Sequence, residues 1–161
     1  FSCTDVYNVP RHRRQVLYVP QALPPMTLSP QAFILECLEF HSRKDISIYQ
    51  TMKTNIDSLC KSMESKLGLS EGKLSEEWSG LSGGERQRAI IGCALILSTI
   101  NDDKYPPMIL LLDEPTAACD NISCQLVEQA IIDSNVTVIL ITHDNSQAIR
   151  LCHRRLVLTA I

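Results

Sequence analysis

Two short apolar runs constrain the fold of this chain more than any other feature of its sequence. They cover Met108–Leu112 and Val136–Ile141, and a segment with helical periodicity, Ile122–Ile131, lies between them. Continuous apolar runs of this length are typical of strands that are buried on both faces of a parallel sheet. Strand, helix and strand in this order indicate α/β architecture. We therefore expect a mostly parallel sheet with helices on both faces.

Further elements are expected around this unit. Residues 13–19 indicate a strand that Pro20 ends, because proline cannot donate to a sheet ladder. Residues 155–159 are interpreted as a last strand. Helices are predicted over about 30–41, from Ile46 to Gly68, over about 84–98 and over about 145–151. Residues from about 28 to 79 thus form a mainly helical insert.

The long helix from Ile46 carries apolar residues at steps of three and four, which indicates an amphipathic helix. We interpret this stripe as core packing rather than as a cofactor site. Its members are Ile48, Met52, Ile56, Leu59, Met63 and Leu67.

The overall composition argues against several classes of function. The 161 residues carry a net charge of −3, so the chain has no global basic field that would favour nucleic acid. Its 7 cysteines include no C-x-x-C pair and are interpreted as reduced thiols packed as small hydrophobes. No apolar run approaches the ~18 residues that a membrane span needs.

Polar side chains follow both apolar runs at the point where each strand is expected to end. Asp113 and Glu114 follow the first run, and Thr142 and His143 follow the second. Ligands bind at the carboxyl ends of strands in open α/β sheets. Adjacent carboxylates at a strand end diverge and can serve different tasks, and an imidazole there can donate to a phosphate. The plainer alternatives are a helix-capping Asp, a surface Glu and a structural His.

A second candidate site precedes the helix expected at 84–98. Gly83 and Gly84 let backbone N–H groups approach a phosphate, and the helix N-terminus adds partial positive charge. The hydroxyl of Ser82 is a further donor. A serine N-cap followed by a glycine turn, with no ligand at all, remains the alternative.

Three motifs in this order resemble the ATP-binding cassette (ABC) ATPases. They are LSGGERQR at 81–88, MILLLDEPT at 108–116 and ITHD at 141–144, and the resemblance covers about 13–161. It implies a P-loop NTPase-like fold. Residues 1–21 and 81–161 would belong to a RecA-like core, and residues 22–80 would form a helical subdomain with the first motif starting at its end.

The resemblance also implies roles for individual residues. Asp113 would hold Mg²⁺ through water, Glu114 would polarise the attacking water, and His143 would sense the γ-phosphate of ATP. Gln21 resembles the family's glutamine loop, which touches Mg²⁺ and the water and senses the membrane partner.

Other residues would serve a second subunit in a head-to-tail dimer. The segment with Ser82, Gly83, Gly84 and Gln87 would contact ATP bound by the opposite subunit. Asp120 resembles the loop that crosses the dimer interface. Cys119 departs from the leucine that is usual before it.

The predicted function is ATP binding and hydrolysis as the nucleotide-binding subunit of an ABC transporter. The partners would be an integral-membrane subunit and a second ATPase subunit, and the location would be cytoplasmic, peripheral on the inner face of a membrane. No G-x-x-x-x-G-K-[ST] loop occurs in the sequence, so we expect one upstream of Phe1. This chain alone is expected to bind ATP poorly, not to hydrolyse it, and to expose a sheet edge and apolar surface.

Alternatives remain open. An ATPase of the same superfamily could act on DNA, although Gln21 and Leu81 are too close in sequence for a long coiled coil, and heptads are absent. An ATPase that works on the ribosome is another reading. A non-catalytic pseudo-ATPase fragment is the alternative from a different class.

Overall fold

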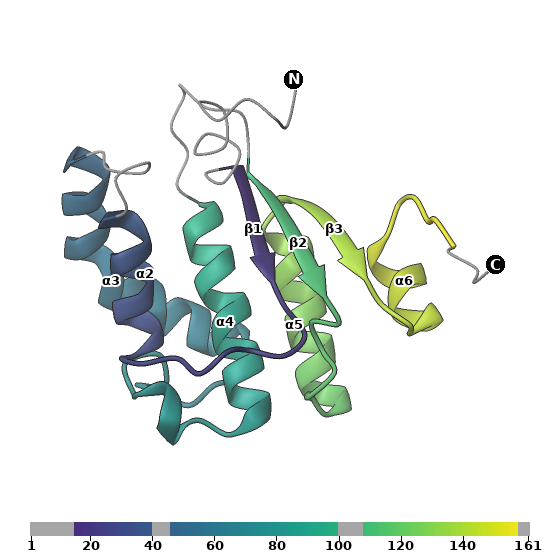
Figure 1. Ribbon diagram of the computed structural model, residues 1–161, viewed down its shortest axis with the longest axis horizontal. Helices are drawn as coiled ribbons and strands as arrows, with labels where there is room; N and C mark the ends of the chain where they lie inside the picture. The colour runs from purple at the N-terminus through teal and green to yellow at the C-terminus, as the bar shows by residue number, and fades with distance from the viewer. Residues whose placement is uncertain (1–14, 40–45, 100–107, 158–161) are drawn as a thin grey trace.

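The computed structural model describes residues 15–39, 46–99 and 108–157 (Figure 1). The elements in chain order are β1 (Val16–Val19), α2 (Pro30–Glu39), α3 (Ile46–Lys66), η2 (Trp78–Gly80), α4 (Gly83–Ser98), β2 (Ile109–Asp113), α5 (Asn121–Asp133), β3 (Thr137–Ile141) and α6 (Asn145–Leu151). The predicted helices and the strands β1, β2 and β3 are confirmed to within a few residues. Residues 155–157 are not part of a strand, and 158–159 lie outside the described residues.

The three strands form one parallel sheet in the order β1-β2-β3. Tyr18 pairs with Leu111, and Leu111 pairs with Ile139. Asp113, the last residue of β2, pairs with Ile141, the last residue of β3. The α/β class and the parallel sheet are therefore confirmed, and the strands bring the two polar strand ends to neighbouring positions.

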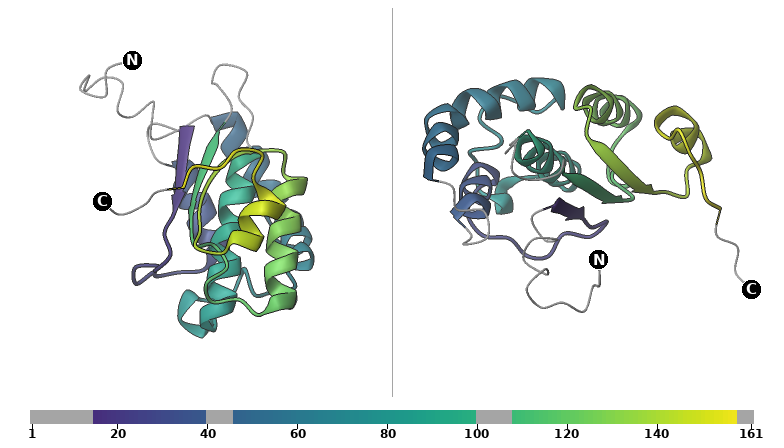
Figure 2. Two further views of the ribbon diagram at one scale, coloured as in Figure 1. Left: turned by 90° about the vertical axis from the view of Figure 1, so that its right-hand side faces the viewer. Right: turned by 90° about the horizontal axis from the view of Figure 1, so that it is seen from above.

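One face of this sheet is packed and the other is open. Leu110 and Leu112 have no exposed surface and belong to the core that also contains much of α4. On the opposite face Tyr18, Ile139 and Ile141 are 55%, 54% and 50% exposed. Figure 2 shows the described helices on one side of the strands. In the described part of the chain one face of the sheet carries the helical layer, and the apolar side chains Ile139 and Ile141 on the other face are half exposed.

Helices α2, α3 and α4 pack against one another beside the sheet. The apolar stripe of α3 lies in the core as predicted, with Met52, Ile56, Met63 and Leu67 buried. Ile34 of α2 is fully buried as well. Trp78 is only 2% exposed, and its ring lies edge-on to Phe33 with centroids 6.4 Å apart. The core-packing interpretation of the insert is confirmed.

The loop between α3 and η2 is held by a buried carboxylate. Glu64 is 3% exposed, and its two oxygens accept the backbone N–H of Leu74 at 2.7 Å and of Gly72 at 3.1 Å. Gly68 ends α3 in the left-handed region with φ 61°, as expected of a residue just past a helix. These contacts fix the segment that leads into the 81–88 motif.

Two of the described cysteines, Cys60 and Cys93, are buried in the core, and the other four are partly exposed. Burial raises the pKa of the Cys60 thiol to about 12 and that of Cys93 well above its usual range. In the described ranges no cluster of three or more His, Cys, Asp or Glu residues could hold a metal ion. None of the helices described is long and apolar enough to cross a bilayer.

Candidate functional site

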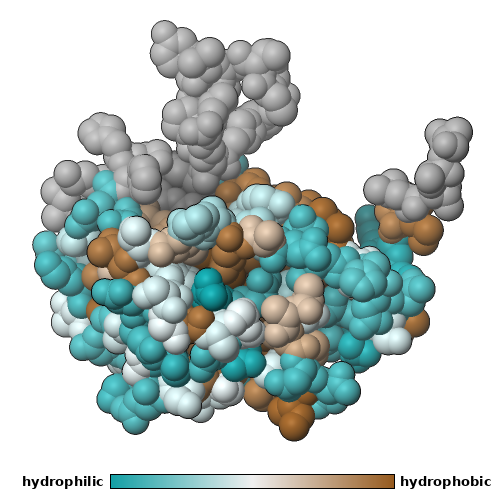
Figure 3. All heavy atoms as spheres, turned by 60° about the horizontal axis from the view of Figure 1, so that its bottom comes forward, coloured by the Kyte–Doolittle hydropathy of each residue, from teal (hydrophilic) through white to brown (hydrophobic). Residues whose placement is uncertain are grey.

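The candidate site lies along the edge of the sheet where the strands end. In Figure 1 the arrowheads of β1, β2 and β3 point toward this edge, and α4 and α5 begin there. Figure 3 brings the lower side of the molecule toward the viewer, where hydrophilic residues predominate with hydrophobic patches between them. Strand ends and helix starts thus share one polar edge, which is where open α/β sheets bind ligands.

Glu114 leaves strand β2 with an unusual backbone. Its φ is 46°, in the left-handed region that non-glycine residues seldom adopt. The backbone N–H of Glu114 donates to the carbonyl of Ile141 at 2.9 Å, so this conformation is held by β3. The kink turns Glu114 away from the course of the strand, and Asp113 and Glu114 contact different partners, as predicted for adjacent carboxylates.

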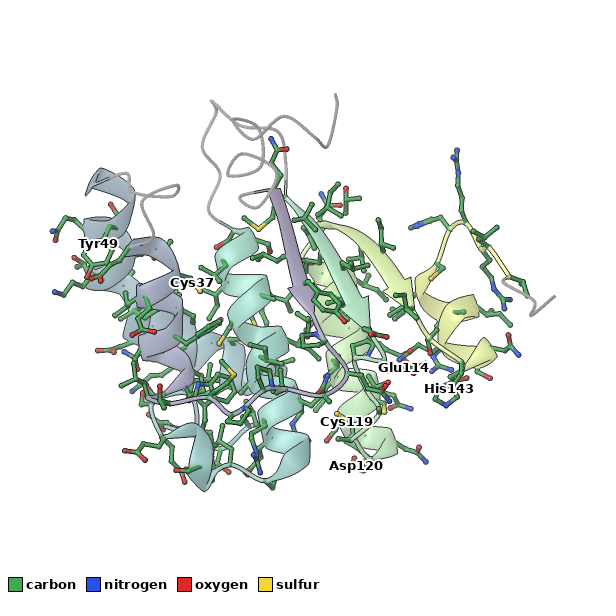
Figure 4. All side chains as sticks on the ribbon, in the orientation of Figure 1. Cys37, Tyr49, Glu114, Cys119, Asp120 and His143 are labelled. Atoms are coloured by element: carbon green, nitrogen blue, oxygen red, sulfur yellow. The ribbon has the colours of Figure 1, made fainter. Side chains whose placement is uncertain are left out.

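Glu114 and His143 are hydrogen-bonded to each other at the ends of β2 and β3. Glu114 Oε1 accepts the backbone N–H of His143 at 2.7 Å and lies 2.7 Å from Nδ1 of its ring. An ionised carboxylate can only accept, so Nδ1 carries the proton in this contact. The side chain of Glu114 is 15% exposed, whereas that of His143 is 84% exposed (Figure 4). With Nδ1 engaged, Nε2 is the ring atom that can meet a ligand.

Asp113 is contacted by a tyrosine from the neighbouring strand. The hydroxyl of Tyr18 donates to Asp113 Oδ2 at 3.1 Å. This hydrogen bond to a carboxylate is the main reason that the pKa of Tyr18 is raised. The contact spans 95 positions of sequence, and no local pattern pointed to it.

Ser82 caps α4 through a reciprocal pair of hydrogen bonds. Its Oγ accepts the backbone N–H of Glu85 at 3.3 Å, and its own N–H donates to Glu85 Oε2 at 2.8 Å. The hydrogen bond from the Ser82 backbone is the main cause of the lowered pKa of Glu85. The serine N-cap is therefore present, and a nucleotide contact by Ser82 or by Gly83, which is exposed, stays a prediction.

The start of α4 lies against the loop that carries Asp120. A Cβ on Gly84 would lie 2.8 Å from the carbonyl oxygen of Ala118, so only glycine fits without a shift. Arg88 Nη1 donates to Ser123 Oγ, which donates to Asp120 Oδ2 at 3.0 Å. The two motif segments therefore touch within one chain.

Asp120 is the N-cap of α5. Its Oδ1 accepts the backbone N–H of Ser123 at 2.9 Å, and this bond is the main cause of the lowered pKa of the carboxyl group. Figure 4 shows Asp120 and Cys119 beside the start of α5. The carboxylate already serves this helix, and a dimer contact by the exposed Asp120 stays a prediction.

Neither of the two glutamines expected in the site is hydrogen-bonded to Asp113 or Glu114 among the described residues. Gln21 is exposed just after β1 and makes no hydrogen bond to Asp113 or Glu114 in the described part of the chain. Gln87 is 4% exposed, and its Nε2 finds no partner among the described residues. A direct nucleotide contact by Gln87 would require its side chain to leave the core, so this role, like the predicted metal contact of Gln21, stays a prediction.

The donor set at the strand ends suits magnesium. Mg²⁺ prefers oxygen ligands and is usually held by one or two carboxylates while phosphates and waters complete its shell. Asp113 and Glu114 supply carboxylates at the edge, and Asp113 is partly exposed. The residues therefore fit a magnesium ion that arrives with a phosphate ligand, and they do not form an all-protein metal cage.

Sequence comparisons agree with this geometry. A family model described as ABC transporter matches residues 2–117. The chain is 33% identical over 145 residues to the molybdate/tungstate import ATP-binding protein WtpC of Methanocaldococcus jannaschii, covering 89% of this chain and 43% of that protein. It is 31% identical over 153 residues to the phosphate import ATP-binding protein PstB of Aeropyrum pernix, covering 91% and 54%. The chain spans about half the length of these curated relatives.

A solved structure shares the fold. The dimeric post-hydrolysis state of the ATP-binding cassette MJ0796 bound to ADP and Pi superposes with a TM-score of 0.66 at 25% identity. The match covers 91% of this chain and 60% of that chain. The similarity thus extends over nearly all of the chain and over part of its longer relative.

Proposed function

Since the chain belongs to the ABC transporter family, we propose that it is part of an ATP-hydrolysing subunit that powers a membrane transporter. The observation that carries this proposal is the contact of Glu114 with His143 at the carboxyl edge of a parallel sheet. A base beside a hydrogen-bond donor, both at strand ends, is the arrangement that phosphoryl transfer to water requires.

In this proposal Glu114 orients the attacking water. Its carboxylate accepts a hydrogen bond from the water and takes a proton as the water oxygen attacks the γ-phosphorus, while the bond from that phosphorus to the bridging oxygen breaks and ADP leaves. His143 keeps its Nδ1–H on Glu114 and offers Nε2 to the γ-phosphate. A donor placed where negative charge develops stabilises the transition state. Donation from Nδ1 and Nε2 at the same time requires the doubly protonated form of the His143 ring.

Asp113 is assigned to the magnesium ion. Mg²⁺ would neutralise charge on the phosphates when bound. The hydroxyl of Tyr18, 3.1 Å from Asp113 Oδ2, orients the carboxylate. Gln21 is assigned to the same ion and to the membrane partner, and its exposed position after β1 is compatible with both roles.

A second subunit is part of the proposal. Ser82, Gly83 and Gly84 present a helix N-terminus at the edge, and exposed backbone N–H groups at such an end suit an anion. We assign this end to ATP held by a second subunit in a head-to-tail dimer, with Asp120 at the interface. The relative solved with ADP and Pi is described as dimeric, which supports this assignment.

The phosphate-binding loop must come from polypeptide beyond these 161 residues. The sequence contains no G-x-x-x-x-G-K-[ST] motif, and the curated relatives are about twice as long. The open face of the sheet, with Ile139 and Ile141 half exposed, offers room for a further helix. Parallel sheets are normally covered on both faces, which supports this placement.

The test is phosphate release from two proteins. The 161-residue chain alone should release none from Mg-ATP, because it lacks the lysine and backbone cradle for the β- and γ-phosphates. The same chain in a protein that includes a phosphate-binding loop should hydrolyse Mg-ATP and dimerise with ATP in light scattering. A folded protein with the loop that binds ATP and releases no phosphate would contradict the proposal.

A further inference from the structure

Gln147 is the most deeply buried polar side chain among the described residues, at 2% exposure. Its Nε2 donates to Thr116 Oγ1 at 2.8 Å and to Glu128 Oε1 at 3.3 Å. Its Oε1 has no hydrogen-bond partner within the described residues. A buried amide with an unpaired oxygen costs free energy, so packing alone does not account for a glutamine here. What the side chain supplies is its pair of N–H donors.

The hydrogen bond to Thr116 connects the two segments that carry Glu114 and His143, and the hydrogen bond to Glu128 connects α6 to α5. Thr116 follows Glu114 by two residues, and Gln147 follows His143 by four. The Gln147–Thr116 hydrogen bond therefore joins the loop after β2 to the first turns of α6. Among the described residues, the other hydrogen bonds between these two segments involve Glu114 itself. The Gln147–Thr116 bond joins the segments through residues that flank the Glu114–His143 pair.

Glu128, which accepts a hydrogen bond from Gln147, also forms an ion pair with Arg150. Arg150 donates from Nε to Glu128 Oε2 and from Nη2 to Glu128 Oε1, both at 2.7 Å. This bidentate contact is the main reason that the pKa of Glu128 is lowered. A carboxylate kept ionised can only accept, so it fixes the Nε2 end of the Gln147 amide toward it. Helices α5 and α6 thus orient the amide before it reaches Thr116.

We propose that Gln147 is a positioning residue that holds His143 against Glu114. It acts through Thr116 and touches neither water nor nucleotide. Its effect on hydrolysis rests on the proposed function, whereas its effect on the Glu114–His143 contact does not. The contact exists in the chain without nucleotide and can be measured there.

The test uses the backbone N–H of His143, which donates to Glu114 Oε1 at 2.7 Å. Gln147→Met keeps the length of the side chain and removes both donors. In ¹H–¹⁵N NMR of the 161-residue chain, the His143 amide should shift toward its position in Glu114→Ala. Its exchange with solvent should become roughly tenfold faster, the loss expected when one hydrogen bond is weakened.

Thr116→Val is the second variant, because it removes the other end of the same bond and retains Gln147. It should move the His143 amide in the same direction, and the double variant should add little, as expected for residues that act as a unit. Gln129→Met is the matched control, since Gln129 lies on the exposed side of α5 and bonds to Asp133. It should leave the His143 amide unchanged.

An unchanged His143 amide in either folded variant, Gln147→Met or Thr116→Val, would overturn the proposal, with folding checked by circular dichroism. In a protein that includes the phosphate-binding loop, Gln147→Met should lower kcat and leave KM for ATP near that of wild type. If wild type itself showed no turnover, the proposed function would fail, and the NMR result would still decide the role of Gln147.

Discussion

The backbone conformation of Glu114 determines which groups its carboxylate contacts at the carboxyl edge of the sheet. With φ at 46° the residue leaves the strand early, and its carboxylate meets both the N–H and the ring of His143. Asp113, one position earlier, accepts from Tyr18 instead. Residues held in sparsely populated backbone regions are common at functional sites. They persist only where surrounding contacts maintain them. Here the carbonyl of Ile141 provides that contact.

Gly84 offers a test at the same scale. A Cβ at this position would meet the carbonyl oxygen of Ala118 at 2.8 Å, and this oxygen belongs to the backbone, which cannot move aside as a flexible side chain can. Gly84→Ala should therefore lower the free energy of unfolding by about 1–3 kcal/mol, the usual range for overpacking. Urea denaturation of the chain followed by circular dichroism measures this change.

The control for Gly84→Ala is its neighbour. A Cβ on Gly83 would meet no atom within 4 Å, so Gly83→Ala should be neutral or slightly stabilising. Equal unfolding free energies for the two variants would show that Gly84 does not lie in close contact with the backbone of the loop after β2.

At the scale of elements, side-chain links join helices across the site. Arg88 connects α4 to α5 through Ser123, and Arg150 connects α6 to α5 through Glu128. The first link continues from Ser123 to Asp120, and the second continues from Glu128 to Gln147. The elements that carry the candidate site are therefore tied to one another away from the sheet.

The α5–α6 link should make stability depend on pH. Because Arg150 lowers the pKa of Glu128 from its ordinary 4.5, the ion pair contributes stability above that value and loses it as pH falls through the lowered one. Urea denaturation should give a steeper loss of stability below about pH 4.5 in wild type than in Glu128→Gln. Glu36→Gln, at an exposed position of α2, should keep the slope of wild type. Parallel pH profiles for wild type and Glu128→Gln would contradict this account.

Sequence patterns predicted the parts of this structure that depend on local order. The cap at Ser82 and the end of α3 at Gly68 follow from residues within a few positions of each other. Glu114 and His143 were each expected at the carboxyl end of a strand, where ligands bind, and the direct contact between them was not predicted. Two hydrogen bonds were missed because their partners are far apart in sequence. They join Tyr18 to Asp113, 95 positions apart, and Gln147 to Thr116, 31 positions apart. Only strand register and helix packing bring such residues together.

At the scale of the whole molecule, the open face of the sheet is the main departure from expectation. The apolar runs predicted burial on both sides, yet Ile139 and Ile141 are half exposed in the described chain. The composition of β3 agrees with a strand that is covered on both faces, and the curated relatives are about twice as long. The sequence indicated that both faces of the strands need to be covered. The layer that would cover the open face is not among the described residues.

In the proposed mechanism Glu114 activates water for ATP hydrolysis, and Glu114→Gln removes the carboxylate that would do so. In a protein that includes the phosphate-binding loop, phosphate release should fall roughly a hundredfold or more, since an amide is a very poor base. ATP-dependent dimerisation should persist, and Glu36→Gln should hydrolyse ATP like wild type. Turnover of Glu114→Gln close to wild type would contradict the account, because the water would then be activated by another group.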